Sequence, residues 1–367
     1  MKHSILLLSI LLPTLAFCQI DTVKSNAGPA KSPLGARSPE VGDSIPSPAV
    51  ATNSLRYFIG FFPINTDPYF GYRTPMYKSE PILFEASPEV RISIYNNIFK
   101  GLSSHKKHTH AEYIHFRTVL RMYNENSNPV KTASTPILLG TQQLWTFADA
   151  ADKTKFRLWA LSFETGHYSN GQSGGAFSEV YADGSKESEA IYNTIAPESN
   201  LSAMLNRKNG NFSTNLTELK GNVRLVKTDA NSLMKRTHSF TLGATLYHNL
   251  MLGLINLGGY TKNDIAIYGR WQTHYAYEYI NTYKGVRYAL SEQLEVIHGA
   301  HPWVEPLRFD TKFTVYPIKN VADLGLAFNW IWGHDNYNYR FVDHGHQFGI
   351  SLTWSVFPPI NLEKPYR

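Results

Sequence analysis

Several stretches of this chain alternate residue by residue between apolar side chains and polar or small ones. In QFGISLTWSVF, five apolar side chains share one face: Phe348, Ile350, Leu352, Trp354 and Val356. A period of two is typical of a β-strand with one apolar face, and it recurs near residues 90–94, 240–246 and 324–332. The inner faces of a soluble sandwich are apolar as well, so the pattern predicts an all-β chain but not its environment.

The first residues indicate export. MKHSILLLSILLPTLAFCQ has a basic start, a short apolar run and a small-residue region, which is the three-part form of a secretory signal peptide. We expect residues 1–18 to be this signal peptide. Residues 19–52, rich in Pro, Ser, Ala and Gly, are expected to form a disordered periplasmic arm. Lipidation of Cys18 would need a small residue before it, and Phe17 is bulky. Cys18 is the only cysteine, so its removal would leave no disulfide or thiol chemistry.

Export, long strands and aromatic residues near strand ends together predict a transmembrane antiparallel β-barrel over residues 53–367. Aromatic residues make up 13% of the chain, which suits a barrel with aromatic girdles. About twelve strands are expected, an even number that lets the sheet close in a bacterial outer membrane. They lie near residues 56–63, 89–99, 112–124, 136–147, 155–169, 212–226, 237–248, 264–283, 286–297, 308–317, 322–332 and 346–357. The net charge of +6 is modest and spread out, and it does not indicate a nucleic-acid partner.

One strand runs into the sequence FETGHYSNGQSG, which begins at Phe163. In a barrel Phe163 must face lipid and Glu164 must face the lumen. The same alternation places His167 and Ser169 on the outer wall, at one membrane rim. The charged residues of the following strand, GNFSTNLTELKGNVRLV, must face the lumen, which turns Asn215 outward too. Neighbouring strands in a meander pair side by side, so a Ser, a His and an Asn converge on one outward patch.

These residue types suit nucleophilic catalysis. A hydroxyl is a weak nucleophile until a base takes its proton, and imidazole is the usual base at neutral pH. An amide can hold the imidazole in the required tautomer, as a carboxylate does in other triads. The non-catalytic interpretation is a polar turn at the rim, because Ser-Asn-Gly is also good turn chemistry, with Asn215 as an ordinary strand-end residue.

GHYSNG followed by FSTN resembles the active-site signature of the outer-membrane phospholipase A1 family, the bacterial outer-membrane phospholipase A. That family has a His-x-Ser-Asn-Gly motif and an Asn on the next strand, and EVRISIYNNIFKGL is similar to its first barrel strand. The resemblance is specific in these motifs and general over residues 80–357. It implies Ser169 as the nucleophile, His167 as the general base and Asn215 as the group that orients His167. The backbone N–H of Gly171 would contribute to an oxyanion hole.

The resemblance also implies a calcium ion near the site, phospholipid substrates and a homodimer. Two of the implied calcium ligands depart from the family pattern: Gln172 replaces an Arg, offering its backbone carbonyl, and Asn211 stands where the family has a hydroxyl, with Ser213 as a further ligand. Asn215 lies 46 residues after Ser169, a much longer separation than in the family. If Asn215 did not reach His167, the next candidates would be Asn193, Asn200, Asn206, Asn209 and Asn211.

Two alternatives stay open, and two interpretations of single features are set aside. A lipid A deacylase on a similar barrel would also carry His-x-Ser, although it pairs its His with an acidic residue. A non-catalytic pore or binding barrel with a vestigial site is the alternative from another class. The His-rich stretch SSHKKHTHAEYIHF is expected to be a solvated loop rather than a metal site, and Glu164 is expected to join an internal polar network.

Overall fold

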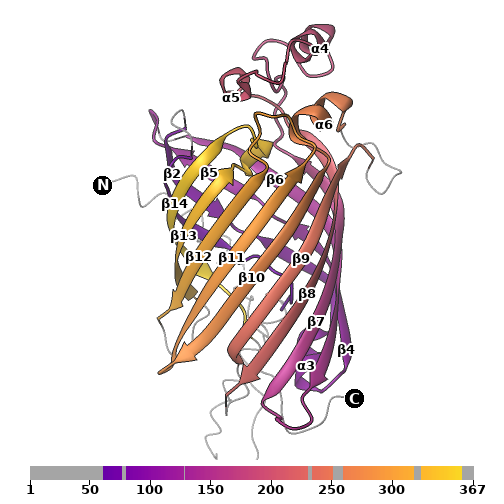
Figure 1. Cartoon of the computed structure of the whole chain (residues 1–367), viewed down its shortest axis with the longest axis vertical. Helices are drawn as coiled ribbons and strands as arrows, with labels where there is room; N and C mark the ends of the chain where they lie inside the picture. Colours follow the sequence, from indigo (N-terminus) through magenta and orange to yellow (C-terminus); the bar gives the residue numbers. More distant parts are fainter. Residues whose placement is uncertain are drawn as a thin grey trace, which may run out of the picture. The chain divides into compact units, whose positions relative to one another are not determined.

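The strands form a closed twelve-strand antiparallel β-barrel (Figure 1), as the alternation predicted. The computed structural model describes residues 61–76, 80–127, 129–229, 234–250, 259–317 and 324–357, which all belong to one unit of the chain, residues 48–367. The expected signal peptide (1–18) and arm (19–52) lie outside the described residues. None of the described helices is long and apolar enough to cross a membrane.

Two barrel strands are interrupted, which is why fourteen labels describe twelve strands. β2 (Ile82–Ser87) and β3 (Val90–Asn96) are halves of one strand, broken at Pro88, which has no N–H for the ladder. β4 (His108–Phe116) and β5 (Val119–Tyr123) are halves of the next, and both pair with β6 (Val130–Ala148). The barrel closes where β1 (Tyr69–Arg73) pairs with β2 on one side and β14 (His344–Trp354) on the other.

The other strands follow one another as an antiparallel meander, each paired with its neighbours in the chain. They are β7 (Lys155–Ser169), β8 (Ser213–Thr228), β9 (Met234–His248), β10 (Trp271–Tyr283), β11 (Val286–His298), β12 (Leu307–Tyr316) and β13 (Leu324–His334). One end of the barrel has short turns, such as residues 284–285, together with α3 (Ile98–Ser103). The other end carries the long connections, with α4 (Lys186–Tyr192), α5 (Leu201–Met204), α6 (Lys262–Tyr268) and η1 (Tyr337–Tyr339) (Figure 1). In outer-membrane barrels the long loops are extracellular and the short turns periplasmic.

Alternation along β7 separates the two faces of the wall as predicted. Trp159 and Phe163 are 51% and 40% exposed, whereas Leu158 and Glu164 are buried in the lumen. The same division holds around the barrel, where the outward positions are apolar and exposed. Examples are Ile92, Leu139, Leu219, Leu242, Phe313, Phe328 and Ile350. In outer-membrane barrels, an apolar outer belt of this kind is the surface that the lipid bilayer covers.

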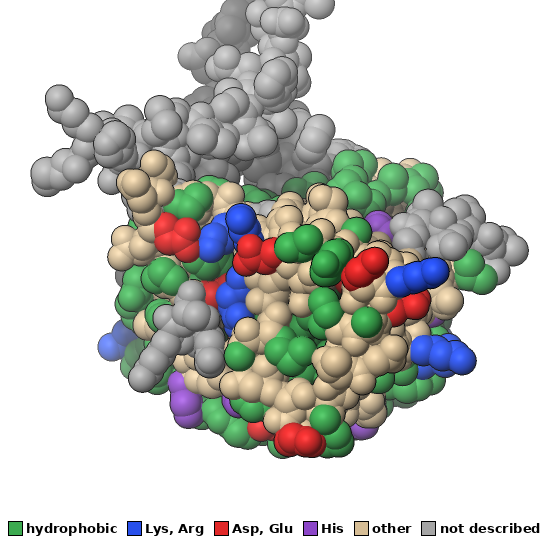
Figure 2. Space-filling model, turned by 90° about the horizontal axis from the view of Figure 1, so that it is seen from above, with side chains coloured by type: hydrophobic (Ala, Val, Ile, Leu, Met, Phe, Trp, Pro, Cys, Tyr) green, Lys and Arg blue, Asp and Glu red, His purple; other side chains and the backbone are tan. Residues whose placement is uncertain are grey.

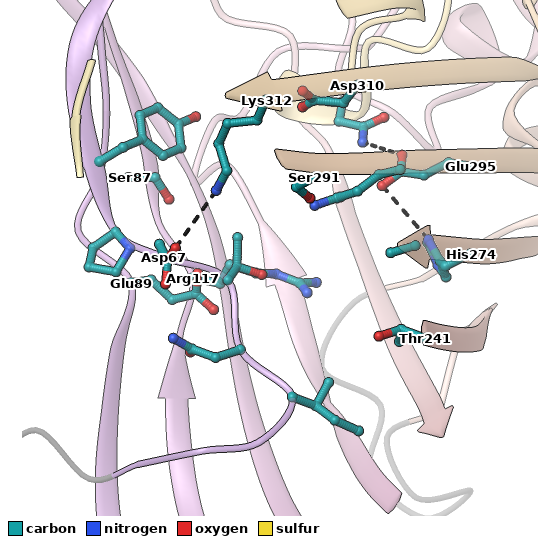
Figure 3. Close-up of a pocket in the computed structure, with 18 of the residues that line it drawn as sticks. Asp67, Ser87, Glu89, Arg117, Thr241, His274, Ser291, Glu295, Asp310 and Lys312 are labelled. Atoms are coloured by element: carbon teal, nitrogen blue, oxygen red, sulfur yellow. Dashed lines mark hydrogen bonds and ion pairs between the residues drawn. The ribbon is translucent and has the colours of Figure 1, made fainter. Parts of the chain in front are cut away.

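Glu164 belongs to an internal polar network, as the sequence predicted. It accepts a hydrogen bond from the Tyr113 hydroxyl at 2.7 Å and lies 3.1 Å from His115 Nδ1. A charged cavity of about 650 Å³ occupies the lumen. In Figure 3, Lys312 reaches toward Asp67 across this cavity.

The lumen is filled with buried apolar side chains on both sides of this cavity. At the extracellular end an aromatic cluster includes Tyr168, Phe212, Tyr247, Tyr260 and Tyr339. The rings of Phe212 and Tyr339 stack with centroids 4.0 Å apart, and Figure 2 shows this end covered by side chains of the loops. A second cluster, toward the periplasmic end, gathers Phe61 and Phe62 with Leu102 of α3 and inward residues of β4 and β6–β9.

Two predicted strands differ from the structure. Residues 56–60 of the expected strand 56–63 lie outside the described residues, and residues 61–63 are not a strand; Phe61 and Phe62 are both buried in the lumen, whereas a wall strand would turn one outward. The start of 264–283 is α6, which begins with a capping box between Thr261 and Asp264, and β10 starts only at Trp271. Ile265 and Ile267 imitate strand alternation within that helix.

Two further predictions need correction. EVRISIYNNIFKGL is not the first barrel strand, because β1 precedes it; its first part is β3 and its end is α3. The stretch with four histidines is not wholly a solvated loop, since β4 begins at His108. His115 is buried in the lumen and bridges Glu89 and Glu164.

Candidate active site

The register of β7 on β8 places the predicted site residues side by side. His167 lies directly opposite Asn215, and Ser169 directly opposite Ser213. Because Tyr168 points into the lumen, His167 and Ser169 both lie on the outer wall. His167 Nδ1 is 3.2 Å from Asn215 Oδ1, within hydrogen-bonding distance. The long separation of Asn215 from Ser169 in sequence therefore does not separate them in space.

The amide of Asn215 is held in one orientation. Asn215 is fully buried, and its Nδ2 donates a hydrogen bond to the backbone carbonyl of Asn249 at 2.8 Å. Its Oδ1 can then only accept, so the hydrogen bond to His167 requires a proton on Nδ1 of the imidazole. In the neutral ring this leaves the Nε2 lone pair of His167 available as a base.

Ser169 ends β7 on the same face as His167 and is half-buried. Among the described residues, no hydrogen bond joins its hydroxyl to His167. Two same-face neighbours on one strand have Cα atoms about 7 Å apart. Catalytic hydrogen bonds are commonly long without substrate and shorten in the complex.

The residues after Ser169 form a tight turn that joins the two ends of the long loop. Asn170 Oδ1 accepts hydrogen bonds from the N–H groups of Gln172 and Phe212, and its Nδ2 donates to Gly210 O. The turn interpretation of Ser-Asn-Gly therefore applies to Asn170. Gly171 has φ +65°, which favours glycine. Within the described part of the chain the N–H of Gly171 donates to no protein oxygen, so it is available to an oxyanion.

A row of hydroxyl groups lies one step along the strands from the His167–Asn215 pair. Thr165 Oγ1 and Thr217 Oγ1 are 2.9 Å apart, and Thr217 Oγ1 is 2.9 Å from His248 Nε2. His248 in turn lies opposite Asn215 on β9. The sequence interpretation missed His248 and Asn249; the outward position of His248 on its strand was the available signal.

The residues predicted to bind calcium offer oxygen atoms of the right kind but few of them. Ser213 lies opposite Ser169, and the backbone N–H of Asn211 donates to Gly174 O. With the carbonyl of Gln172 they supply three oxygens, whereas calcium takes about six to eight and usually includes carboxylates. No cluster of three or more His, Cys, Asp or Glu side chains in the described chain is arranged to hold a metal. The described residues therefore do not make a complete calcium site, and no chemical step below depends on one.

The alternative asparagines of the loop have structural roles. Asn200 caps α5 by accepting a hydrogen bond from Ala203 N, and Asn193 is the C-cap of α4. The Nδ2 of Asn206 donates to Asn209 Oδ1. None of these contacts involves His167.

These features define the class of the molecule, an outer-membrane-type β-barrel with a Ser, a His and an Asn on its outer wall. The chain is similar in structure to outer membrane phospholipase A from Escherichia coli, with 9% identity, a TM-score of 0.43 and coverage of 81% of this chain and 95% of that one. A Salmonella typhi outer membrane phospholipase dimer with bound calcium gives 9% identity, a TM-score of 0.41 and coverage of 82% and 96%. LpxR from Salmonella typhimurium gives 8% identity, a TM-score of 0.33 and coverage of 79% and 100%. No family model matches the chain, and no curated protein matches its sequence. Similarity at this level does not identify a reaction, so the function has to be argued from the site.

Proposed function

We propose that this protein is a phospholipase of the bacterial outer membrane that hydrolyses acyl esters of glycerophospholipids with Ser169, His167 and Asn215. The observation that carries the proposal is the 3.2 Å contact between His167 Nδ1 and Asn215 Oδ1 on the lipid-facing wall. An oriented imidazole two residues from a serine is the arrangement that nucleophilic ester hydrolysis needs.

The reaction proceeds in two steps. His167 Nε2 accepts the proton of Ser169 as Oγ attacks the ester carbonyl, and the imidazolium is stabilised through Nδ1–H by Asn215 Oδ1. The N–H of Gly171 donates to the oxyanion. Collapse breaks the ester bond, and His167 returns the proton to the leaving lysophospholipid oxygen. Water, deprotonated by His167, then attacks the acyl carbonyl; the fatty acid leaves, and His167 returns the proton to Oγ of Ser169.

The outward position of the site explains the substrate class. Phe163 and Leu161 continue the same face of β7 into the apolar belt, so an acyl chain can lie along them while its ester reaches Ser169. Ser169 is at the end of β7 that leads to the long loops. A lipid of the outer leaflet would therefore reach the site sideways, without leaving the bilayer.

Replacing Ser169 with Ala tests the proposal. Fatty-acid release from phospholipid in mixed micelles is expected to fall by about 10³-fold or more, because the nearby Thr165 and Thr217 hydroxyls are engaged with one another and with His248. Ser173→Ala, at an exposed position of the following loop, is the matched control and should retain the parent rate. Equal activity of the parent and the Ser169→Ala variant would refute the assignment.

The amide partner of His167 also bears on the lipid A deacylase alternative. A lipid A deacylase is expected to pair its His with an acidic residue, whereas in this chain the imidazole of His167 contacts Asn215. Assaying lipopolysaccharide beside glycerophospholipid separates the two, since release from lipopolysaccharide alone would favour the deacylase.

A homodimer belongs to the same proposal. Glu112 lies 2.7 Å from His110 on the outward face of β4, in the cross-strand row of Thr141 and Phe163. Charged side chains are costly on a lipid-facing wall, and a second copy would cover them. Calcium held by Gln172, Asn211 and Ser213 remains an expectation from the resemblance.

A further inference from the structure

A cleft of about 530 Å³ lies next to the candidate site on the side of the long loops. Asn170 and Gln172, the first residues beyond the strand that carries Ser169, contribute to its lining. One side is the hairpin between β5 and β6, and the other is the long loop between β7 and β8. The sequence interpretation treated this loop only as an insertion.

Each side of the cleft carries one acidic and one basic side chain. On the hairpin, Lys131 Nζ is 2.8 Å from Glu125 Oε1; on the loop, Lys208 Nζ is 3.6 Å from Glu179 Oε2. Lys208 and Glu179 are 76% and 59% exposed. Exposed pairs of this kind contribute little to stability. Each partner can therefore exchange its contact for a charge on a ligand at little cost.

The arginines that also line the cleft are already matched by buried carboxylates. Arg207 Nη2 lies 2.5 Å from Asp343 Oδ1, and Arg340 pairs with Glu80. These pairs join the cleft to the extracellular end of the barrel. The charges available to a ligand are therefore those of these two pairs, although Lys131 is half-buried and lies 4.3 Å from the ring centroid of Tyr123. Figure 2 shows acidic and basic side chains next to one another on this end of the molecule.

We propose that this cleft binds the head group of the lipid whose ester Ser169 attacks, and that it favours zwitterionic glycerophospholipids with a primary ammonium group. The inference rests on the proposed phospholipase function. Lys131 and Lys208 would contact the phosphate, while Glu125 and Glu179 would contact the ammonium. A head group with a phosphate but no ammonium would leave these two carboxylates without a partner beside its negative charge, which costs affinity.

The direction of the bound lipid supports this placement. Its acyl chain follows Phe163 into the apolar belt, its ester lies at Ser169, and its head group must then extend toward the loops and water. Gln172 is three residues beyond Ser169, so their Cα atoms are within about 11 Å. That is the range over which a glycerophospholipid head group extends from its ester.

The test compares phosphatidylethanolamine with phosphatidylglycerol of the same acyl chains in mixed micelles of a neutral detergent. The parent protein is expected to show a kcat/KM about tenfold higher for phosphatidylethanolamine. In the double variant Glu125→Gln with Glu179→Gln this ratio should fall at least about fivefold, chiefly by loss on the zwitterionic lipid. Lys131→Gln with Lys208→Gln should lower kcat/KM on both lipids, because both carry the phosphate.

The matched control is the exposed pair of Lys155 and Asp152, 3.1 Å apart at a periplasmic turn. Asp152→Asn with Lys155→Gln should leave the ratio unchanged. An unchanged ratio in the Glu125→Gln, Glu179→Gln variant, with Ser169-dependent hydrolysis intact, overturns the head-group site and leaves the phospholipase proposal standing.

If the parent does not hydrolyse either lipid, the phospholipase proposal fails. Calorimetric binding of short-chain phosphatidylethanolamine and phosphatidylglycerol to the Ser169→Ala protein then tests the cleft alone. Equal affinities would overturn it, and a preference that the Glu125→Gln, Glu179→Gln changes remove would support it.

Discussion

At the residue scale, the candidate site depends on how one amide is oriented. Asn215 uses both ends of its side chain: Nδ2 donates to Asn249 O, and Oδ1 faces His167 Nδ1. Because the carbonyl of Asn249 can only accept, the amide cannot flip without losing this contact. A carboxylate at the same place would face that carbonyl with a negative charge. The structure of the site therefore suits Asn better than Asp.

Replacing Asn215 with Ala should reduce kcat by about 10²–10⁴-fold with little change in KM, because the imidazole of His167 loses the acceptor that fixes its tautomer. Asn215→Asp is expected to recover only part of this loss. The control is Asn222→Ala, which removes a buried asparagine from the lumen side of the same strand, where Nδ2 donates to Ser239 Oγ. Steady-state kinetics on phospholipid micelles measures both. A parent-like kcat in Asn215→Ala would exclude Asn215 from the site.

At the scale of elements, three neighbouring strands are joined on their outer face just below the site. The contacts His248 Nε2 to Thr217 Oγ1 and Thr217 Oγ1 to Thr165 Oγ1 link β9, β8 and β7. Thr165 also donates to the carbonyl of Leu216. This chain of hydrogen bonds fixes the lateral position of β7, which carries the proposed base His167, relative to β8, which carries Asn215.

Thr217→Val should interrupt this chain without changing the volume of the side chain much. We expect kcat to fall by about tenfold, with the pH dependence of kcat retained, because the base and its partner remain in place but are less well positioned. Thr273→Val is the matched control, since Thr273 Oγ1 makes the same kind of contact with His298 Nε2, at 3.0 Å, on β10 and β11. If both valine variants behave alike in the kinetic assay, the Thr217 contact has no specific role.

Element by element, alternation predicted the long strands well because their lumen side is polar and their outer side apolar. It missed β1 and β2, which have only five and six residues, and it mistook α6 for a strand because Ile265 and Ile267 are two apart. Alternation and the meander predicted that His167 and Asn215 share the outward face of neighbouring strands, and the resemblance implied their pairing. Their direct opposition, like the contact of His248 with Thr217, depends on the registers of β7, β8 and β9. These registers are set by side-chain packing and hydrogen bonds across the sheet, which period-two alternation does not encode.

At the scale of the whole barrel, the interior bears on the pore alternative. The aromatic cluster around Tyr339 fills the extracellular end of the lumen, and Phe61 and Phe62 fill it toward the periplasmic end. Between them, ion pairs cross the cavity, such as Lys312 to Asp67 at 3.8 Å. Phe62 packs edge-on against Tyr113, with ring centroids 4.9 Å apart. Within the described residues, buried apolar side chains therefore narrow the lumen on both sides of a polar chamber.

Planar-bilayer recording of the reconstituted protein should accordingly show no steady open-channel conductance above the baseline of a protein-free bilayer. Phe61→Ala with Phe62→Ala should remain silent as well, because the aromatic cluster at the other end is untouched. Adding Tyr339→Ala to these two changes removes the stacking partner of Phe212. This triple variant is expected to produce conductance steps, since aromatic side chains are then missing from both ends of the lumen. Lipid-facing Leu326→Ala controls for membrane insertion, its side chain lying on the outer wall.

Steady conductance of the parent, together with hydrolysis that does not depend on Ser169, would favour the pore over the phospholipase. If the parent protein gives no conductance and its hydrolysis depends on Ser169, the polar chamber would instead stabilise the barrel wall. His115 and Glu164 would then hold β4 and β7 together behind the proposed catalytic face.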